Sequence, residues 1–228
     1  YRYASGQQVN NWDGKYIGQA RVRYAIEHSM NVCAVRTLTE TVGLEKGYQY
    51  LQKFGFTTLV NNDPDYPGMS DVAQSTALGG ITRGVYNIEM TAAYAAIANG
   101  GVYTEPILYT EILDHDGNVL IDNSAPETHQ VIKDSTAYLL TSAMEDVITR
   151  GTGTSARLSN MPVAGKTGTT ENSTDLWLSA YTPYYTASVW CGYAENKHME
   201  NMSQSWHIVI LRHFMQRIHE GLEYKDFT

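Results

Sequence analysis

The 228-residue sequence has too few cysteines to build a metal or redox centre around them. Cys33 and Cys191 lie far apart, without a C-x-x-C or Cys/His spacing, so neither a zinc site nor a redox motif is expected. A disulfide between them stays open on the count alone, although two small apolar thiols in a core are the commoner arrangement. The sequence predicts no metal site and no cofactor.

Positive charge and long apolar runs are also scarce. Sixteen Lys and Arg stand against 24 Asp and Glu, a net charge of −8, so broad affinity for nucleic acid or anionic membranes is not expected. No apolar run approaches the roughly 18 residues that span a bilayer. The start, "YRYASGQQVNNWDGKYIG", lacks the basic and apolar blocks of a signal peptide and is typical of the middle of a protein. We therefore expect a fragment of a longer chain.

Apolar residues make up 43% of the chain, which suffices for a core in one large domain or two small ones. Helical spacing and end signals predict five helical segments. They are 21–43, interrupted near Ser29-Met30-Asn31; 44–55, ended by Gly55; 87–101, capped by Asn87; 134–151, capped by Asp134 or Ser135; and 205–220, with Ile208, Leu211, Met215 and Ile218 on one face.

Strand patterns occur in two places. A hairpin is predicted at 107–122 around Asp116-Gly117, and "MPVAGKTGTT", "DLWLSAYT" and "YYTASVWCGY" read as three successive strands. Strands and helices kept in separate runs favour an α+β fold with a mainly antiparallel sheet. A mainly helical part at about 15–150 would carry the hairpin, and about 160–228 would hold the three strands and the last helix.

The stretch "VAGKTGTT", from Val163 to Thr170, has two interpretations. A P-loop requires G-x-x-x-x-G-K-[ST], but Asn160 occupies the position of its first glycine, and the residues after Lys166 are poor helix formers. Nucleotide binding is therefore not favoured. As a strand, the stretch offers a lysine charge, two threonine hydroxyls and a glycine that admits close approach, a combination suited to an anionic substrate terminus.

Ser29-Met30-Asn31 is a second element of the same kind. With Lys166-Thr167-Gly168 it resembles two of the three signatures of the penicillin-binding, serine β-lactamase-like superfamily, namely S-x-x-K, S-x-N and K-T-G. Blocks such as "ALGGITRGVYNIEMTAAYAAIANGGVYTEP" and "PVAGKTGTTENSTDLWLSAYTP" are similar to the transpeptidase domain of class A, bifunctional penicillin-binding proteins, in that family's order. The resemblance covers most of the chain, which would make 1–228 a partial transpeptidase domain.

The resemblance implies a D,D-transpeptidase that cross-links peptidoglycan stem peptides ending in D-Ala-D-Ala and that β-lactams acylate. Ser29 would relay protons, and Asn31 would hold a substrate amide. Lys166 would supply positive potential. Thr167 and Thr169, on either side of Gly168, would bind the terminal carboxylate, and the Thr169 N–H would be an oxyanion-hole donor.

Three further residues are weaker candidates for the border of the cleft. Thr152 lies in "RGTGT", whose glycines are most simply a helix stop and a turn, although a role in shaping the cleft stays open. Trp177 and Tyr181 would border the groove by analogy with the family. Aromatic residues on strands are, however, more often part of the core.

The third signature is missing, because no serine in the sequence is followed three residues later by a lysine. A truncated enzyme and a pseudo-enzyme would both fit, and the abrupt start favours truncation. We expect that this chain forms no acyl-enzyme. The resemblance also implies a parent anchored by an N-terminal membrane helix, with this domain on the extracytoplasmic face of the membrane. A non-catalytic binding or scaffolding module of the same fold is the alternative.

The resemblance also has a structural consequence. In the family, two further sheet strands precede the nucleophile helix, so "YYTASVWCGY" would lie at an unpaired edge. We expect weak stability or self-association through that edge.

Overall fold

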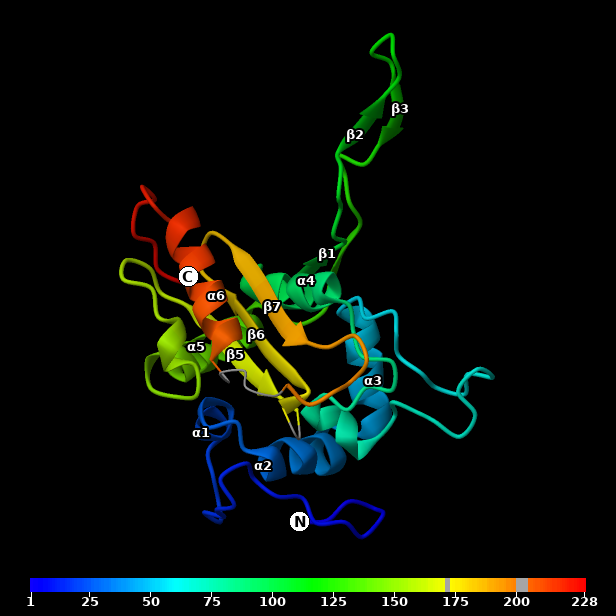
Figure 1. Ribbon diagram of the computed structural model, residues 1–228, viewed down its shortest axis with the longest axis vertical. Coiled ribbons are helices and arrows are strands. Elements are labelled where there is room, and N and C mark those ends of the chain that lie inside the picture. Colours follow the sequence, from blue (N-terminus) through cyan, green and yellow to red (C-terminus); the bar gives the residue numbers. More distant parts are fainter. Residues whose placement is uncertain (171–172, 200–204) are drawn as a thin grey trace.

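The computed structural model describes residues 1–170, 173–199 and 205–228, and its centre is an antiparallel sheet with helices on both faces (Figure 1). The order of elements is helices, a hairpin, a helix, three strands and a final helix, as the sequence patterns predict. The α-helices are α1 Val22–Glu27, α2 Asn31–Arg36, α3 Leu44–Lys53, α4 Asn87–Ala98, α5 Asp134–Thr149 and α6 Trp206–Ile218. None of the described helices is long and apolar enough to cross a membrane.

The central sheet consists of β5 Ala164–Thr169, β6 Asp175–Tyr181 and β7 Thr186–Gly192, in the order β5-β6-β7. All pairings are antiparallel, and the register sets Lys166 opposite Ser179 and Gly168 opposite Trp177. The three predicted strands are therefore confirmed. β5, which carries the Lys166 motif, is an edge strand, so one side of it is free to meet other parts of the chain.

The two faces of the sheet bury different layers of side chains. Leu178 and Ala180 point to one face, where they pack with α6 through Leu211 and Met215. On the opposite face, the Ala164 and Tyr181 side chains pack against α5 and α4. Lys166 is two residues from Ala164 on β5, so its side chain leaves the strand on the same face, toward α5.

The predicted helix over 21–43 is broken into three pieces. α1 ends at Glu27, α2 begins at Asn31, and a π-helical segment, η1 Thr37–Val42, follows. The break falls at Ser29-Met30-Asn31, where the helical pattern of the sequence falters. Two short 3₁₀ segments, η2 Gln74–Leu78 and η3 Thr154–Ala156, complete the helical elements of the described chain.

The predicted hairpin projects away from the body of the molecule (Figure 1). Its strands are β2 Glu111–Leu113 and β3 Val119–Asp122, and every residue of both strands is exposed. A further pair, β1 Val102–Thr104 with β4 Thr128–Gln130, joins the hairpin to the body; the sequence patterns did not indicate it.

The predicted helix caps are wrong. Tyr86 precedes α4 and Lys133 precedes α5, and neither helix receives a side-chain cap from any described residue. Asn87 is instead the first residue of α4, and its side-chain amide donates 3.2 Å to the Ser188 carbonyl on β7. The residue chosen as a cap therefore joins a helix to the sheet.

The open questions on the cysteines and the sheet edge have structural answers. Cys33 and Cys191 are free, half-buried thiols, with no disulfide in the described chain, and burial raises the pKa of Cys191. β7 pairs only with β6 among the described residues. On its other side, the Asn87 side chain at the start of α4 donates to the Ser188 carbonyl.

Candidate active site

Ser29 occupies a strained turn between α1 and α2. Its φ is 53°, in the left-handed region where a non-glycine residue is uncommon. The Ser29 N–H donates 3.2 Å to the Ile26 carbonyl, and the Met30 N–H donates 2.9 Å to the Ala25 carbonyl. These are the two bonds of a Schellman motif, which usually places glycine where Ser29 stands. A serine held in this conformation indicates that its side chain is needed at that point.

Lys166 on β5 meets this turn from the sheet. Its Nζ donates 2.8 Å to Ser29 Oγ and 2.8 Å to the Thr167 carbonyl. Burial lowers the pKa of Lys166 to about 8, because a desolvated ammonium is less stable than a hydrated one. The two motifs recognised in the sequence thus touch, and β5 continues as a strand through Thr169, where a P-loop requires a helix.

The hydroxyls of Thr152 and Thr167 lie 2.8 Å apart and share a hydrogen bond. Thr152 follows the C-terminal end of α5, and its N–H donates 3.3 Å to the Glu27 carbonyl at the end of α1. Thr152 therefore links α1, the end of α5 and β5. Thr167 and Gly168 are half-buried, whereas Thr169 is exposed at the end of the strand.

Asn31, the third residue of the turn, is held from the N-terminal loop. Its Nδ2 donates 3.0 Å to the Asn10 carbonyl, and its Oδ1 can act only as an acceptor. The buried Asn11 accepts 3.1 Å from the Val32 N–H in the first turn of α2, and Trp12 Nε1 donates 2.8 Å to the His28 carbonyl. These supports could not be predicted from the sequence, because Asn and Trp in a polar loop have no distinctive spacing.

The aromatic candidates differ in position. Trp177 lies opposite Gly168 and is half-buried, with its ring centroid 6.4 Å from that of Trp190. A Cβ at Gly168 would fall 3.3 Å from the Trp177 Cβ, so any other residue there would crowd Trp177. Tyr181 is corrected to a core residue, because it is 0% exposed and its hydroxyl bonds Thr141 at 2.7 Å. Burial raises the pKa of Tyr181.

The arrangement brings together a lysine of lowered pKa and the hydroxyls of Ser29, Thr152 and Thr167. Such a set can hold a carboxylate by charge and hydroxyl bonds, and it can pass a proton between a lysine and a serine. Among the described residues, no three His, Cys, Asp or Glu side chains are grouped so as to hold a metal.

Residues 1–216 match the family described as penicillin binding protein transpeptidase domain. Penicillin-binding protein 1A of Clostridium acetobutylicum is 41% identical over 184 residues, which cover 80% of this chain and 22% of that protein. Penicillin-binding protein 1A of Clostridium novyi is 35% identical over 222 residues, which cover 96% of this chain and 24% of that protein. The chain therefore spans about a quarter of the curated relatives it matches.

Solved structures share the fold. PonA1 from Mycobacterium tuberculosis, in complex with penicillin V, superposes with a TM-score of 0.83 at 23% identity, over 99% of this chain and 63% of that one. Penicillin-binding protein 1A from Haemophilus influenzae superposes with a TM-score of 0.76 at 22% identity. The match covers 97% of this chain and 37% of that one. The chain belongs to the penicillin-binding protein transpeptidase domain family.

Proposed function

We propose that this site binds the carboxylate end of a D-Ala-D-Ala stem peptide, as part of the D,D-transpeptidase site of a class A, bifunctional penicillin-binding protein. The observation that carries the proposal is the 2.8 Å bond from Lys166 Nζ to Ser29 Oγ, which joins the two family motifs at one point. The family match over residues 1–216 supports the reaction class.

In this proposal the terminal carboxylate lies along β5. Lys166 provides the positive potential, and the Thr167 and Thr169 hydroxyls donate to the carboxylate oxygens. Thr167 can keep its bond to Thr152 at the same time, because a hydroxyl donates once and accepts as well. The Thr169 N–H serves as an oxyanion-hole donor, a role typically worth about 3 kcal/mol of barrier.

Ser29 and Asn31 act on the other side of the peptide. Ser29 Oγ accepts from Lys166, so its own O–H is free to donate and to relay a proton toward the leaving amine. Asn31 Oδ1 accepts the N–H of a substrate amide while Nδ2 stays bonded to the Asn10 carbonyl. Trp177 borders the groove beside Gly168.

The nucleophile of the reaction is absent from the sequence, which has no S-x-x-K. We therefore expect the chain to bind reversibly and to form no acyl-enzyme. Incubation with a fluorescent penicillin followed by intact-mass spectrometry checks this point: the mass stays unchanged. A covalent adduct mapped to any serine would contradict the assignment of the nucleophile to the parent protein.

The parent's setting is proposed on the same grounds. A bifunctional parent would sit at the membrane with this domain on the extracytoplasmic face, where stem peptides and β-lactams reach it. The relatives that the chain matches are named penicillin-binding protein 1A. A non-catalytic scaffolding module is the second candidate, and only the missing S-x-x-K favours it. If the gene of the full-length parent also lacks S-x-x-K, the scaffolding function is the better explanation.

Calorimetry with an acetylated tripeptide ending in D-Ala-D-Ala tests the binding proposal. The same peptide with a C-terminal amide is the matched control, because it differs only in the carboxylate. We expect the acid to bind and the amide to bind at least tenfold more weakly. Equal affinities for acid and amide would rule out a carboxylate site.

A further inference from the structure

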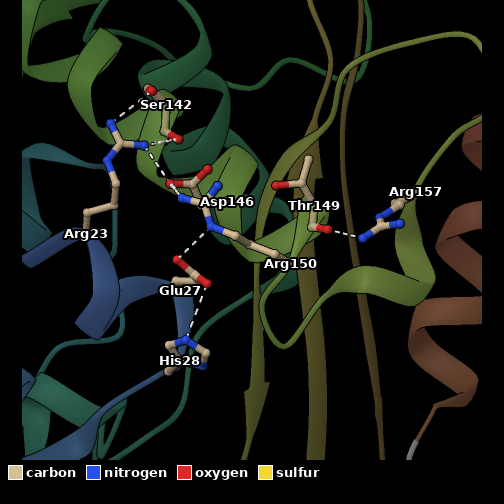
Figure 2. Close-up of polar contacts among 8 residues, drawn as sticks. All are labelled: Arg23, Glu27, His28, Ser142, Asp146, Thr149, Arg150 and Arg157. Atoms are coloured by element: carbon tan, nitrogen blue, oxygen red, sulfur yellow. Dashed lines mark hydrogen bonds and ion pairs between the residues drawn. The ribbon is translucent and has the colours of Figure 1, made fainter.

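Two arginines and two carboxylates form a connected cluster at the end of α1, which precedes the Ser29 turn in the chain (Figure 2). Arg150 Nε contacts the Glu27 carboxylate at 3.1 Å, and Arg150 Nη2 bonds Asp146. Arg23 contacts the same Asp146 oxygen at 2.8 Å and also reaches the Ser142 carbonyl. The two carboxylate side chains are 10% and 13% exposed, so both charges are largely removed from water.

The cluster holds α1 in place, because this helix is too short to be stable by itself. α1 has six residues and receives no side-chain cap from the described chain, so little of its stability is intrinsic. Arg23 and Glu27 lie four residues apart, on one face of α1, and both bind α5 or the turn after it. These contacts therefore decide where α1 lies relative to α5.

Glu27 makes contacts next to the site through both its side chain and its backbone. Its carboxylate binds Arg150, and its backbone carbonyl accepts the Thr152 N–H at 3.3 Å. Gly151 makes the approach feasible, because a Cβ there would lie 2.3 Å from the Glu27 carbonyl oxygen. Ser29 follows Glu27 by two residues, so the end of α1 and the Thr152 turn are held against each other next to the Lys166 contact.

We propose that Glu27 and Arg150 are positioning residues of the active site: their ion pair holds the Ser29 turn and Thr152 in register with Lys166 and Thr167 on β5. This inference deepens the proposed function and rests on it for the role of the site. In the described part of the chain, neither side chain makes a polar contact with Ser29, Lys166 or Thr167. The pair acts through the Ser29 backbone on one side and through the Thr152 N–H on the other.

Charge balance explains why the Glu27–Arg150 pair should affect the position of the Ser29 turn more than an ordinary surface ion pair would. Asp146 has Arg23 as a second partner, whereas the other partner of Glu27 is His28, at 3.3 Å, which is charged only when protonated. Without Arg150, the buried Glu27 carboxylate would be left poorly compensated and would move toward water. The Ser29 turn would move with it.

The test uses two variants, Glu27→Gln and Arg150→Gln, in the full 228-residue chain. Native-state hydrogen exchange is measured at the Met30 and Thr152 amides, which report the turn, and at the Leu178 amide in the central strand. We expect exchange at Met30 and Thr152 to rise at least tenfold with little change at Leu178. Affinity for the D-Ala-D-Ala tripeptide should fall about tenfold.

The matched control is Glu40→Gln, which removes a carboxylate from the exposed Arg36–Glu40 pair and should change neither readout. If a single variant fails to fold, the double variant Glu27→Gln/Arg150→Gln leaves no buried charge unpaired and should show the same selective loss of protection. Equally faster hydrogen exchange at all three amides, or unchanged exchange at all of them, would overturn the positioning role. If the unmutated chain fails to bind the tripeptide, the proposed function falls, while the exchange pattern still decides the inference.

Discussion

The ammonium of Lys166 donates a 2.8 Å hydrogen bond to the hydroxyl of Ser29, 137 residues away in the sequence. Lys166 comes from an edge strand and Ser29 from the turn that ends a six-residue helix. The contact places a lysine of lowered pKa beside a hydroxyl held in a left-handed turn. The predictions below follow from this pair and from the elements that hold it.

Binding of the D-Ala-D-Ala tripeptide should depend on the charge of Lys166. Its pKa of about 8 means that the lysine is charged below pH 8 and becomes neutral above it. Affinity should therefore be constant below about pH 7 and fall roughly tenfold or more as pH rises through 8, since a charge-assisted hydrogen bond contributes about 1.5–3 kcal/mol. Calorimetry across this range measures the effect. Lys166→Arg stays charged and should give a flat profile, whereas a flat profile for the unmutated chain would contradict the role of Lys166.

The backbone strain at Ser29 should appear as a difference in stability between two substitutions of this residue. Ser29→Ala and Ser29→Gly both remove the hydroxyl, but only alanine keeps a Cβ in the left-handed region, where φ is 53°. We expect the glycine variant to be more stable than the alanine variant by about 1 kcal/mol, measured by urea unfolding. The opposite order would show that the turn is not strained. Both variants should bind the tripeptide more weakly than the unmutated chain.

The shared hydrogen bond of Thr152 and Thr167 should appear as a coupling energy. Thr152→Val and Thr167→Val each remove one hydroxyl of a pair that lies 2.8 Å apart. Each should lower the free energy of unfolding by about 1 kcal/mol, and the double variant should cost clearly less than the sum. Additive losses in the double-mutant cycle would show that the two hydroxyls do not interact in solution.

The outer edge of β7 should make the chain self-associate. β7 pairs with β6 on one side, and on the other the Asn87 amide covers the Ser188 carbonyl. An edge with further free backbone groups is a template for another strand. We expect sedimentation to show dimers as concentration rises, and the β7 amides to become more protected from exchange while those of β5 do not. A chain that remains monomeric at high concentration, with unchanged β7 exchange, would count against strand pairing.

The sequence predicted the parts of the fold that depend on local pattern. Alternation identified β5, β6 and β7, and the faltering helical pattern at Ser29-Met30-Asn31 marked the break between α1 and α2. Helix caps were mispredicted because Asn87 has a long-range partner, the Ser188 carbonyl, which no local rule reveals. Tyr181 was misplaced for a related reason, since the layer that covers its face of β6 comes from α4 and α5.

The site was predictable only where its residues form a recognised motif. Ser29 and Lys166 were found in this way, but their 2.8 Å contact depends on how α1 is held against α5. Glu27 and Arg150, which provide that hold, are separated by more than a hundred residues and have no spacing signature. Charged pairs of this kind are visible only once the chain is folded.

We propose that Ser29, Asn31 and the Lys166–Thr169 stretch form one binding site for the D-Ala-D-Ala end of a stem peptide, with the carboxylate on the β5 side. Backbone amide chemical shifts, recorded by NMR while the D-Ala-D-Ala tripeptide is added, test it most directly. We expect saturable shifts concentrated at 29–31, 152 and 166–169, and none of comparable size with the C-terminal amide. Shifts confined to other regions, such as the N-terminal loop or the β2–β3 hairpin, or identical maps for acid and amide, would contradict it.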